Sequence, residues 1–478
     1  MKEVIFNMSR TRLLLFTLLL SFAAIVSNAQ KNKPATITPP VTVPDTSKNS
    51  LLMPVVVRDS AGTGAESLTL RQCIDYAMQH QPGVNKALIN VDIARTTNAI
   101  NLSGWLPQVN AQGTLNHYIQ TSSSGSSSAI SSSGSSVNRN TFIPGVSVSQ
   151  ALFSPNLMYA ARSANLYIKQ AQQVTDSTKI FLVSAVSKSF YNVLLTLEQI
   201  NVLKEDTARL GKSVRDAYHQ YKGGIVDETD YEEATITLNN SMAQLKQANE
   251  NVVPQYAMLK QVMGYPPEKQ FNVSFDTTEM EQNIHIDTLQ QLQYEKRIEY
   301  QQVKTAHDLQ DETVHYYKYS FLPTLSAFYN YNLAYANNQF SDLFNKSYPN
   351  QLVGVSFSIP IFTGFYRTNN LKKARLEQKI IDWNTVDLKS QIYKEYATAL
   401  GNYKGNFYNL QLLQKNVNMA KRVYFVVTLQ YKQGIVPYLN VITAESNLIS
   451  SEISYLNALF QVLSNKIDLQ KAMGNITY

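Results

Sequence analysis

The sequence is poor in the residues that build covalent or metal-bound scaffolds. The 478-residue chain has one cysteine and two tryptophans, and only 16% of its residues are charged. A single cysteine excludes an internal disulfide, a Cys-based zinc cluster and an iron–sulfur site. The net charge of +7 is small for this length, and no basic block suited to nucleic acid is present. We therefore expect no nucleic-acid partner.

Motifs that carry enzyme chemistry are also missing. The sequence has no Walker motif, no G-x-G-x-x-G, no G-x-S-x-G and no H-E-x-x-H. The histidines show no metal-ligand spacing: His80, His117, His219, His285, His307 and His315. One acidic group lies at a predicted helix start, where acids favour the helix dipole: Glu228, Asp230, Glu232 and Glu233. The sequence therefore predicts neither an enzyme nor a cofactor or metal site.

The N-terminus has the pattern of an exported protein. Residues 1–29 combine a basic start, an apolar stretch and a small-residue cleavage site, which predicts a signal peptide. An N-terminal membrane anchor is the alternative interpretation. Residues 30–66 are rich in Pro, Thr, Ser and Lys and predict a flexible lead-in. Because no later segment has about 18 consecutive apolar residues, we expect no transmembrane helix after processing.

An internal repeat organises the rest of the chain. Four landmarks recur in one order, at separations of 216, 209, 210 and 210 residues. They are Leu106-Pro107 with Leu322-Pro323, Gly145-Val146-Ser147 with Gly354-Val355-Ser356, Tyr221-Lys222 with Tyr431-Lys432, and Met263-Gly264 with Met473-Gly474. The separation shortens where a serine-rich run, 122–136, lengthens the first copy. We expect a first repeat over 67–270, a connection over 271–290 and a second repeat over 291–478.

Each repeat begins with a helix and continues into two strands. Apolar and polar residues alternate with a period of two, which predicts strands at 107–118 and 142–153, and at 322–333 and 351–362. One face of these strands is apolar, and the other carries small uncharged polar residues, as expected around a wet lumen. Several of the 29 tyrosines cluster at the strand ends, as in an aromatic girdle. This pattern favours a membrane β-barrel over a soluble sheet.

A long helical hairpin follows each pair of strands. The hairpins are expected over 155–263 and 364–474, and their apolar residues recur in steps of three and four, which predicts coiled-coil packing. Each long helix should stop at a glycine landmark, Gly223-Gly224 or Gly434, because glycine suits the left-handed residue beyond a helix end. The sequence therefore predicts a mainly α chain with four strands, arranged as two tandem repeats.

The landmarks together resemble the TolC family of bacterial outer-membrane efflux proteins over most of the mature chain. The resemblance implies a homotrimer with a twelve-stranded barrel in outer-membrane lipid and an α-helical periplasmic tunnel, in a Gram-negative bacterium. It implies a passive exit duct of a tripartite efflux or type I secretion system. The partners would be a periplasmic adaptor protein and an inner-membrane pump.

The resemblance also implies roles for the helix tips. The turns that would dock the adaptor are Gly223, Gly224 and Ile225 in the first copy, and Gly434, Ile435 and Val436 in the second. Paired aspartates on the second-copy tip often bind cations at the periplasmic gate in this family. The matching positions here are Asn440 and Thr443, and an aspartate is kept only in the first copy, as Asp230.

A second function class stays open at this point. The alternative is an exported coiled-coil structural or adhesive protein without a channel, whose strands form a small soluble sheet. The duplicated strand pairs and their alternating faces favour the duct. The sequence does not name the transported substrate or the class of pump.

Overall fold

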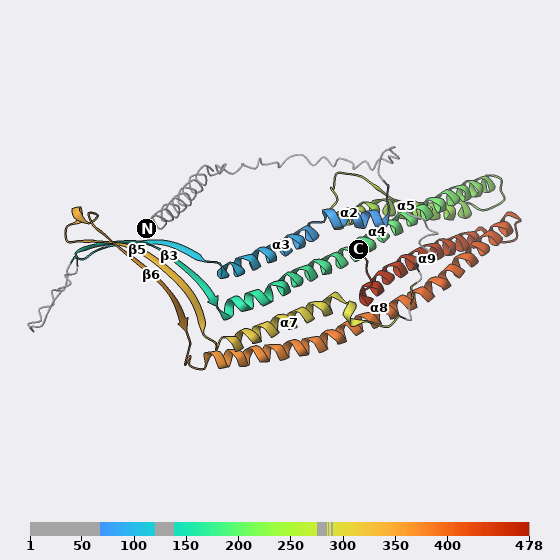
Figure 1. The fold of residues 1–478 in the computed structure, drawn as a ribbon. Coiled ribbons are helices and arrows are strands. Elements are labelled where there is room, and N and C mark those ends of the chain that lie inside the picture. The colour runs from blue at the N-terminus through green and yellow to red at the C-terminus, as the bar shows by residue number, and fades with distance from the viewer. Residues whose placement is uncertain (1–66, 120–137, 275–283, 285, 288–289, 478) are drawn as a thin grey trace, which may run out of the picture. The chain divides into compact units, whose positions relative to one another are not determined.

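The computed structural model describes residues 67–119, 138–274, 284, 286–287 and 290–477 of a unit that spans 64–478. The predicted signal peptide 1–29, the lead-in 30–66 and the serine-rich run 122–136 lie outside the described residues, as does most of 275–289. Most described residues are helical. The four long strands lie at one end of the unit, and the tips of the helical hairpins lie at the other end (Figure 1).

The first repeat opens with β1 (Ser67–Leu68), α2 (Leu70–His80), α3 (Pro82–Leu102) and the 3-10 turn η1 (Ser103–Trp105). Thr69 caps α2 in a capping box with Gln72. The single helical stretch expected here is interrupted at Gln81-Pro82, so that prediction was wrong at this point. Proline has no N–H and its ring clashes with the preceding helical turn, and Pro82 therefore starts a new helix.

Two helical hairpins make up most of the unit. The first joins α4 (Pro155–Lys222) to α5 (Glu228–Met263), and the second joins α8 (Tyr366–Lys432) to α9 (Tyr438–Met473). The connection between the repeats contains β4 (Asn272–Val273), which pairs in parallel with β1. The turn η2 (Tyr294–Lys296) and the helix α7 (Ile298–Tyr319) then open the second repeat.

The four long strands form one antiparallel sheet in the order β2-β3-β5-β6. They are β2 (Gln108–His117), β3 (Asn140–Phe153), β5 (Thr324–Asn337) and β6 (Ser347–Ser358), with the turn η3 (Phe340–Asp342) between the last two. The strand predicted over 351–362 extends past the end of the observed strand, because β6 ends at Ser358. Ser358 pairs with Thr324, the first residue of β5, so no partner backbone is left beyond it. Pro360 also lacks the N–H that a ladder needs.

The start of α8 also differs from the expectation. The hairpin expected from residue 364 begins at Tyr366, and the residue that precedes α8 is Phe365, with no side-chain cap. Gly364 and Phe365 both have positive φ, 60° and 62°. The chain therefore turns from β6 into α8 through two successive left-handed residues.

Near the sheet the helices form a layer in which α3 packs on α4, α4 on α7, and α7 on α8 (Figure 1). Further along, α9 packs on α4 and α8, and the largest core lies where α2, α4, α5, α8 and α9 meet. Buried residues of α8 follow the predicted seam in steps of four and seven: Ala399, Tyr403, Leu410 and Val417. The heptad pattern therefore marks the packed side of this helix.

One described helix passes a composition test for a membrane span. An 18-residue window of α4 has a mean hydropathy of 1.5, and 56% of that window is buried within the protein. A core helix has the same character, and the burial of Val186, Val193 and Leu194 accounts for the apolar window.

Candidate functional site

The first hairpin tip is a glycine turn. The N–H of Ile225 donates to the carbonyl of Gln220 at 2.9 Å, and the N–H of Gly224 donates to that of Tyr221 at 2.9 Å. This is the Schellman arrangement, which satisfies two carbonyls at a helix end. Gly224 has φ = 70°, the left-handed value that the sequence predicted for the landmark glycine.

The second tip repeats this geometry. The N–H of Ile435 donates to the carbonyl of Gln430 at 3.0 Å, and the N–H of Gly434 donates to that of Tyr431 at 2.9 Å. Gly434 has φ = 71°, and nothing lies within 4 Å of the position that a Cβ would occupy. Glycine is therefore required at both tips by backbone conformation and not by lack of space.

The tips present apolar side chains to the surroundings. Ile225 is 75% exposed and Ile435 is 69% exposed, and Leu439 on the first turn of α9 is also exposed. Val436 is half-buried, and Gly223 is exposed. The two exposed isoleucines thus lie at the ends of the two long hairpins, one on each tip turn.

The three predicted gate residues lie beside these turns but are not joined to one another. Asp230 lies in the first turn of α5. Burial, followed by repulsion from Asp227, raises the pKa of its carboxyl. Asn440 and Thr443 are exposed on α9, and the Thr443 hydroxyl donates to the Leu439 carbonyl. In the described part of the chain, no hydrogen bond or ion pair links Asp230 to either of them.

Other contacts hold the two tips together. Tyr431 at the end of α8 donates a hydrogen bond to Gln220 at the end of α4. Ala217 and Ala234 of the first hairpin pack with Tyr438 and Val441 of the second. Each tip is therefore packed against the other within one chain.

A buried charged cluster lies further from the tips, and the sequence reasoning missed it. Arg209 of α4 contacts both Asp206 on the same helix and Glu445 of α9, and both carboxylates are almost completely buried. A signal was present, because Asp206 lies between Leu203 and Leu210 in the heptad rhythm of α4. A charged residue at a seam position is expected to face another helix.

The sheet has two chemically different faces. In the row that joins Val109, Val148, Tyr329 and Val353, every paired residue is apolar or aromatic. The row one residue further along joins Asn110, Ser147, Asn330 and Leu352, which are mostly polar. The apolar side chains are largely exposed in the isolated chain, Val353 among them. Nothing within the described chain covers this face.

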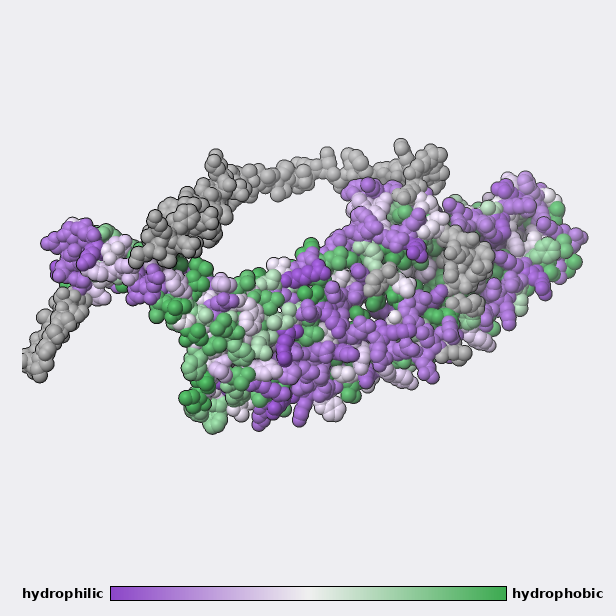
Figure 2. All heavy atoms as spheres, viewed as in Figure 1, coloured by the Kyte–Doolittle hydropathy of each residue, from purple (hydrophilic) through white to green (hydrophobic). Residues whose placement is uncertain are grey.

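Apolar surface gathers where the sheet meets α7 and α8 (Figure 2). The exposed residues at this junction include Ile361, Phe362, Phe365 and Tyr366, and the rings of Phe362 and Phe365 meet edge to face at 5.7 Å. The layer of helices beyond the junction shows mostly polar surface in the same view. The apolar zone thus continues from the strands to the first turn of α8.

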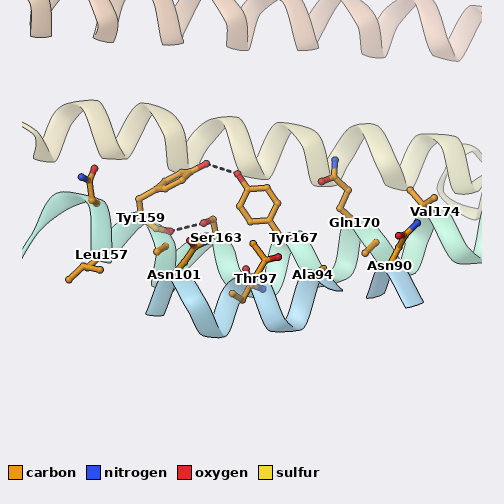
Figure 3. Close-up of a pocket in the computed structure, with 14 residues that line it drawn as sticks. Asn90, Ala94, Thr97, Asn101, Leu157, Tyr159, Ser163, Tyr167, Gln170 and Val174 are labelled. Atoms are coloured by element: carbon orange, nitrogen blue, oxygen red, sulfur yellow. Dashed lines mark hydrogen bonds between the residues drawn. The ribbon is translucent and has the colours of Figure 1, made fainter. Parts of the chain in front are cut away.

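A groove of about 810 Å³ lies between α3 and α4 (Figure 3). Its lining is uncharged, with Asn90, Thr97 and Asn101 on α3, and Tyr159 and Tyr167 on α4. The two tyrosine hydroxyls share a hydrogen bond of 2.9 Å. The lining includes no nucleophile paired with a base and no charged group, so it offers no catalytic arrangement.

One group of described residues meets the spacing of a metal site. His307, Asp308 and Asp311 on α7 each have a potential ligand atom within 4.8 Å of the others. Each ring nitrogen of His307 lies 3.4 Å from a carboxylate, Asp311 on one side and Asp382 of α8 on the other. The side chains of His307, Asp311 and Asp382 are all partly exposed, and surface contacts of this kind carry little energy.

A known protein family matches both repeats of the chain. The family model described as outer membrane efflux protein matches residues 73–265 and 291–475, one segment in each repeat. The chain belongs to the outer-membrane efflux protein family. It is therefore an outer-membrane efflux channel, an exit duct, and the family is one of transport proteins and not of enzymes. This membership decides against the structural or adhesive protein.

Individual members of the family are similar along nearly their whole length. The outer membrane protein TolC of Vibrio cholerae is 20% identical over 439 residues, which cover 89% of this chain and 96% of that protein. The cation efflux system protein CusC of Escherichia coli O157:H7 is 23% identical over 425 residues, 85% of each chain. A crystal structure of CusC superposes with a TM-score of 0.72 at 18% identity, covering 90% of this chain and 98% of that one.

Proposed function

We propose that three copies of this efflux protein form one continuous duct. Within the described chain, β2 and β6 are the outer strands of the sheet, and each pairs on one side only. A sheet in lipid cannot leave such edges open, because unpaired backbone groups are costly there. Pairing β2 of one copy with β6 of the next closes a barrel of four strands from each of three copies, twelve in all. The exposed apolar face then meets lipid.

The helical layer supports the same assembly. Its outer helices, α3 and α8, each expose an apolar stripe at helical spacing. On α3 the stripe contains Ile89, Ile93 and Ile100, and on α8 it contains Leu376, Ile380 and Trp383. Contact between α3 of one copy and α8 of the next buries both stripes, and the helices continue the barrel as a periplasmic tunnel.

The hairpin tips form the periplasmic end of this duct. The turns at Gly223, Gly224 and Ile225, and at Gly434, Ile435 and Val436, dock a periplasmic adaptor that connects to an inner-membrane pump. The exposed isoleucines of both tips support this role. Asp230, Asn440 and Thr443 line the entrance. With one carboxylate in each copy at these positions, the entrance holds cations less strongly than a ring of paired aspartates.

The two tryptophans provide a test of the assembly. Trp383 is 73% exposed in the single chain, whereas the proposed contact with α3 covers it. A Trp105→Phe variant reports Trp383 fluorescence alone. In the assembled protein we expect weak acrylamide quenching, and strong quenching after dissociation to monomers. A matched Trp383→Phe variant reports Trp105 as the control. Equal quenching of Trp383 in the assembled and dissociated states would contradict the proposed α3–α8 contact.

A further inference from the structure

Two carboxylates are buried with one guanidinium where α4 meets α9. Asp206 is 0% exposed and Glu445 is 1% exposed. Arg209 reaches both, with Nη2 at 3.4 Å from Asp206 Oδ1 and Nε at 3.5 Å from Glu445 Oε1. If both acids are ionised, the cluster carries one uncompensated negative charge. A buried charge without a partner is strongly disfavoured, so one acid is expected to hold a proton.

The hydrogen bonds assign that proton to Glu445. Asp206 Oδ2 accepts a hydrogen bond of 2.6 Å from the hydroxyl of Ser241 on α5. Neither carboxylate oxygen of Glu445 has a hydrogen-bond partner among the described residues. Burial, followed by repulsion from Asp206, raises the pKa of Glu445 to about 7, although Arg209 and Tyr424 favour its ionised form. Burial also raises the pKa of Asp206.

Among the described residues, the other groups around the cluster supply no second cation to Glu445. Tyr424 of α8 faces it, and burial, followed by repulsion from Glu445, raises the pKa of that phenol. Tyr438 of α9 is buried, and its hydroxyl has no hydrogen-bond partner among the described residues. Lys421 of α8 pairs with Glu452 at 3.2 Å, and Glu452 repels Asp206.

Apolar packing flanks the cluster on both sides. Toward the tips, Ala217 and Ala234 pack with Val441. Away from the tips, Leu203 and Ala248 pack with Ile453. Each of the two groups joins residues of the first hairpin to a residue of the second. The charged cluster therefore lies between two apolar parts of the contact between the hairpins, at a place where adding or removing a proton changes that contact.

We propose that Glu445 is a proton-operated latch between the two helical hairpins. The protonated side chain allows α9 to pack on α4, and its ionisation weakens that contact. The consequence for the duct rests on the proposed function: separation of the hairpins widens the periplasmic entrance. The latch itself is a property of one chain.

The direction of the pH effect follows from the raised pKa. A carboxyl that binds its proton more tightly in the packed state stabilises packing at low pH. This stabilisation is complete below the ordinary value of 4.5 and is lost as the pH rises to about 7. For one such group, the equilibrium shifts toward separated hairpins about tenfold between pH 6 and pH 8.

Hydrogen–deuterium exchange of the full-length protein in detergent measures this equilibrium. The readout is amide exchange in residues 438–452 between pH 6 and pH 8, corrected for the intrinsic rate at each pH. We expect an increase of about tenfold in the wild type. Glu445→Gln mimics the protonated acid, so its exchange should stay at the low-pH level throughout. Glu205→Gln is the matched control, because Glu205 also contacts Arg209 but its side chain is 78% exposed. It should keep the pH dependence.

A pH-independent wild type would overturn the latch, and so would an equal pH dependence in the Gln variant. If Glu445→Gln does not fold, Glu445→Met removes the carboxylate at similar volume and carries the same expectation. Conductance of the wild type in planar bilayers separates the two proposals. If the wild-type protein conducts ions but its amide exchange does not depend on pH, the latch is refuted and the duct is not. If its amide exchange depends on pH but it conducts no ions, the duct is refuted and the latch is not.

Discussion

Replacing Gly434 with alanine isolates the energetic contribution of the left-handed tip turn. The position has φ = 71°, and nothing lies within 4 Å of an added Cβ, so no collision contributes. An L-residue in this conformation costs about 1–2 kcal/mol. Alanine also lowers the conformational entropy of the unfolded chain, which stabilises the folded protein by about 0.4–1 kcal/mol. The tip should therefore lose about 1 kcal/mol, the difference between these two ranges.

Local amide exchange detects a loss of this size. A destabilisation of about 1 kcal/mol speeds exchange through local opening about fivefold, and the effect should be confined to the end of α8 and the start of α9. Gly434→Asn should have a smaller effect, because asparagine tolerates the left-handed region. Gly434→Val should have a larger one, because its branched Cβ is disfavoured there.

Gly211 provides the matched control. It lies within α4, and an added Cβ at that position also meets nothing within 4 Å. Gly211→Ala should stabilise its helix by about 0.5–1 kcal/mol and slow local exchange, the opposite sign to Gly434→Ala. If the two substitutions change exchange in the same direction, or if Gly434→Ala leaves it unchanged, backbone conformation does not explain the tip glycine.

Two further substitutions test the sheet and the core. At Gly145 an added Cβ meets Asn332 Oδ1 and the Tyr331 carbonyl, whereas at Gly113 the nearest atom is 3.5 Å away. Gly145→Ala should therefore reduce the stability of the sheet by about 1–3 kcal/mol and lower the yield of folded protein in the outer-membrane fraction. Gly113→Ala should keep the wild-type yield. Equal yields of the two variants would refute this reasoning. Arg297 is 3% exposed and donates to the Ala472 carbonyl and to Glu299 and Glu395. Arg297→Met should lower the free energy of unfolding by about 2–3 kcal/mol in thermal unfolding, because it leaves a buried acceptor unpaired. The control Arg95→Met removes only an exposed pair with Asp92 and should cost less than about 1 kcal/mol. A similar loss in both variants would contradict the structural role of Arg297.

Features set by local backbone chemistry were predictable from the sequence. The positive φ values of Gly224 and Gly434 follow from where a helical pattern meets glycine, since only glycine occupies that region freely. The alternation in β5 and β6 likewise follows from the period of a strand. The end of β6 was not predictable in the same way. It depends on where its partner β5 begins, and the apolar alternation through Ile359 and Ile361 continues past that point.

The buried cluster of Asp206, Arg209 and Glu445 could be predicted only in part from the sequence. The heptad rhythm indicates that Asp206 lies on the packed side of α4, but sequence spacing does not reveal which helix faces it. Arg209 and Glu445 are 236 positions apart in the chain, and only the packing of α9 on α4 brings them to 3.5 Å. The adaptor-docking and entrance roles of the tips concern other molecules, and they stay predictions from the family resemblance.

Single-channel recording in a planar lipid bilayer tests the duct most directly. Purified full-length protein added to one side should produce stepwise currents, because the proposed trimer encloses one continuous aqueous path. Addition of Trp383→Asp, which places a charge in the proposed α3–α8 contact, should reduce the number of insertion events while a Trp105→Phe control inserts as the wild type does. Folded wild-type protein that enters the bilayer and conducts no ions would contradict the account.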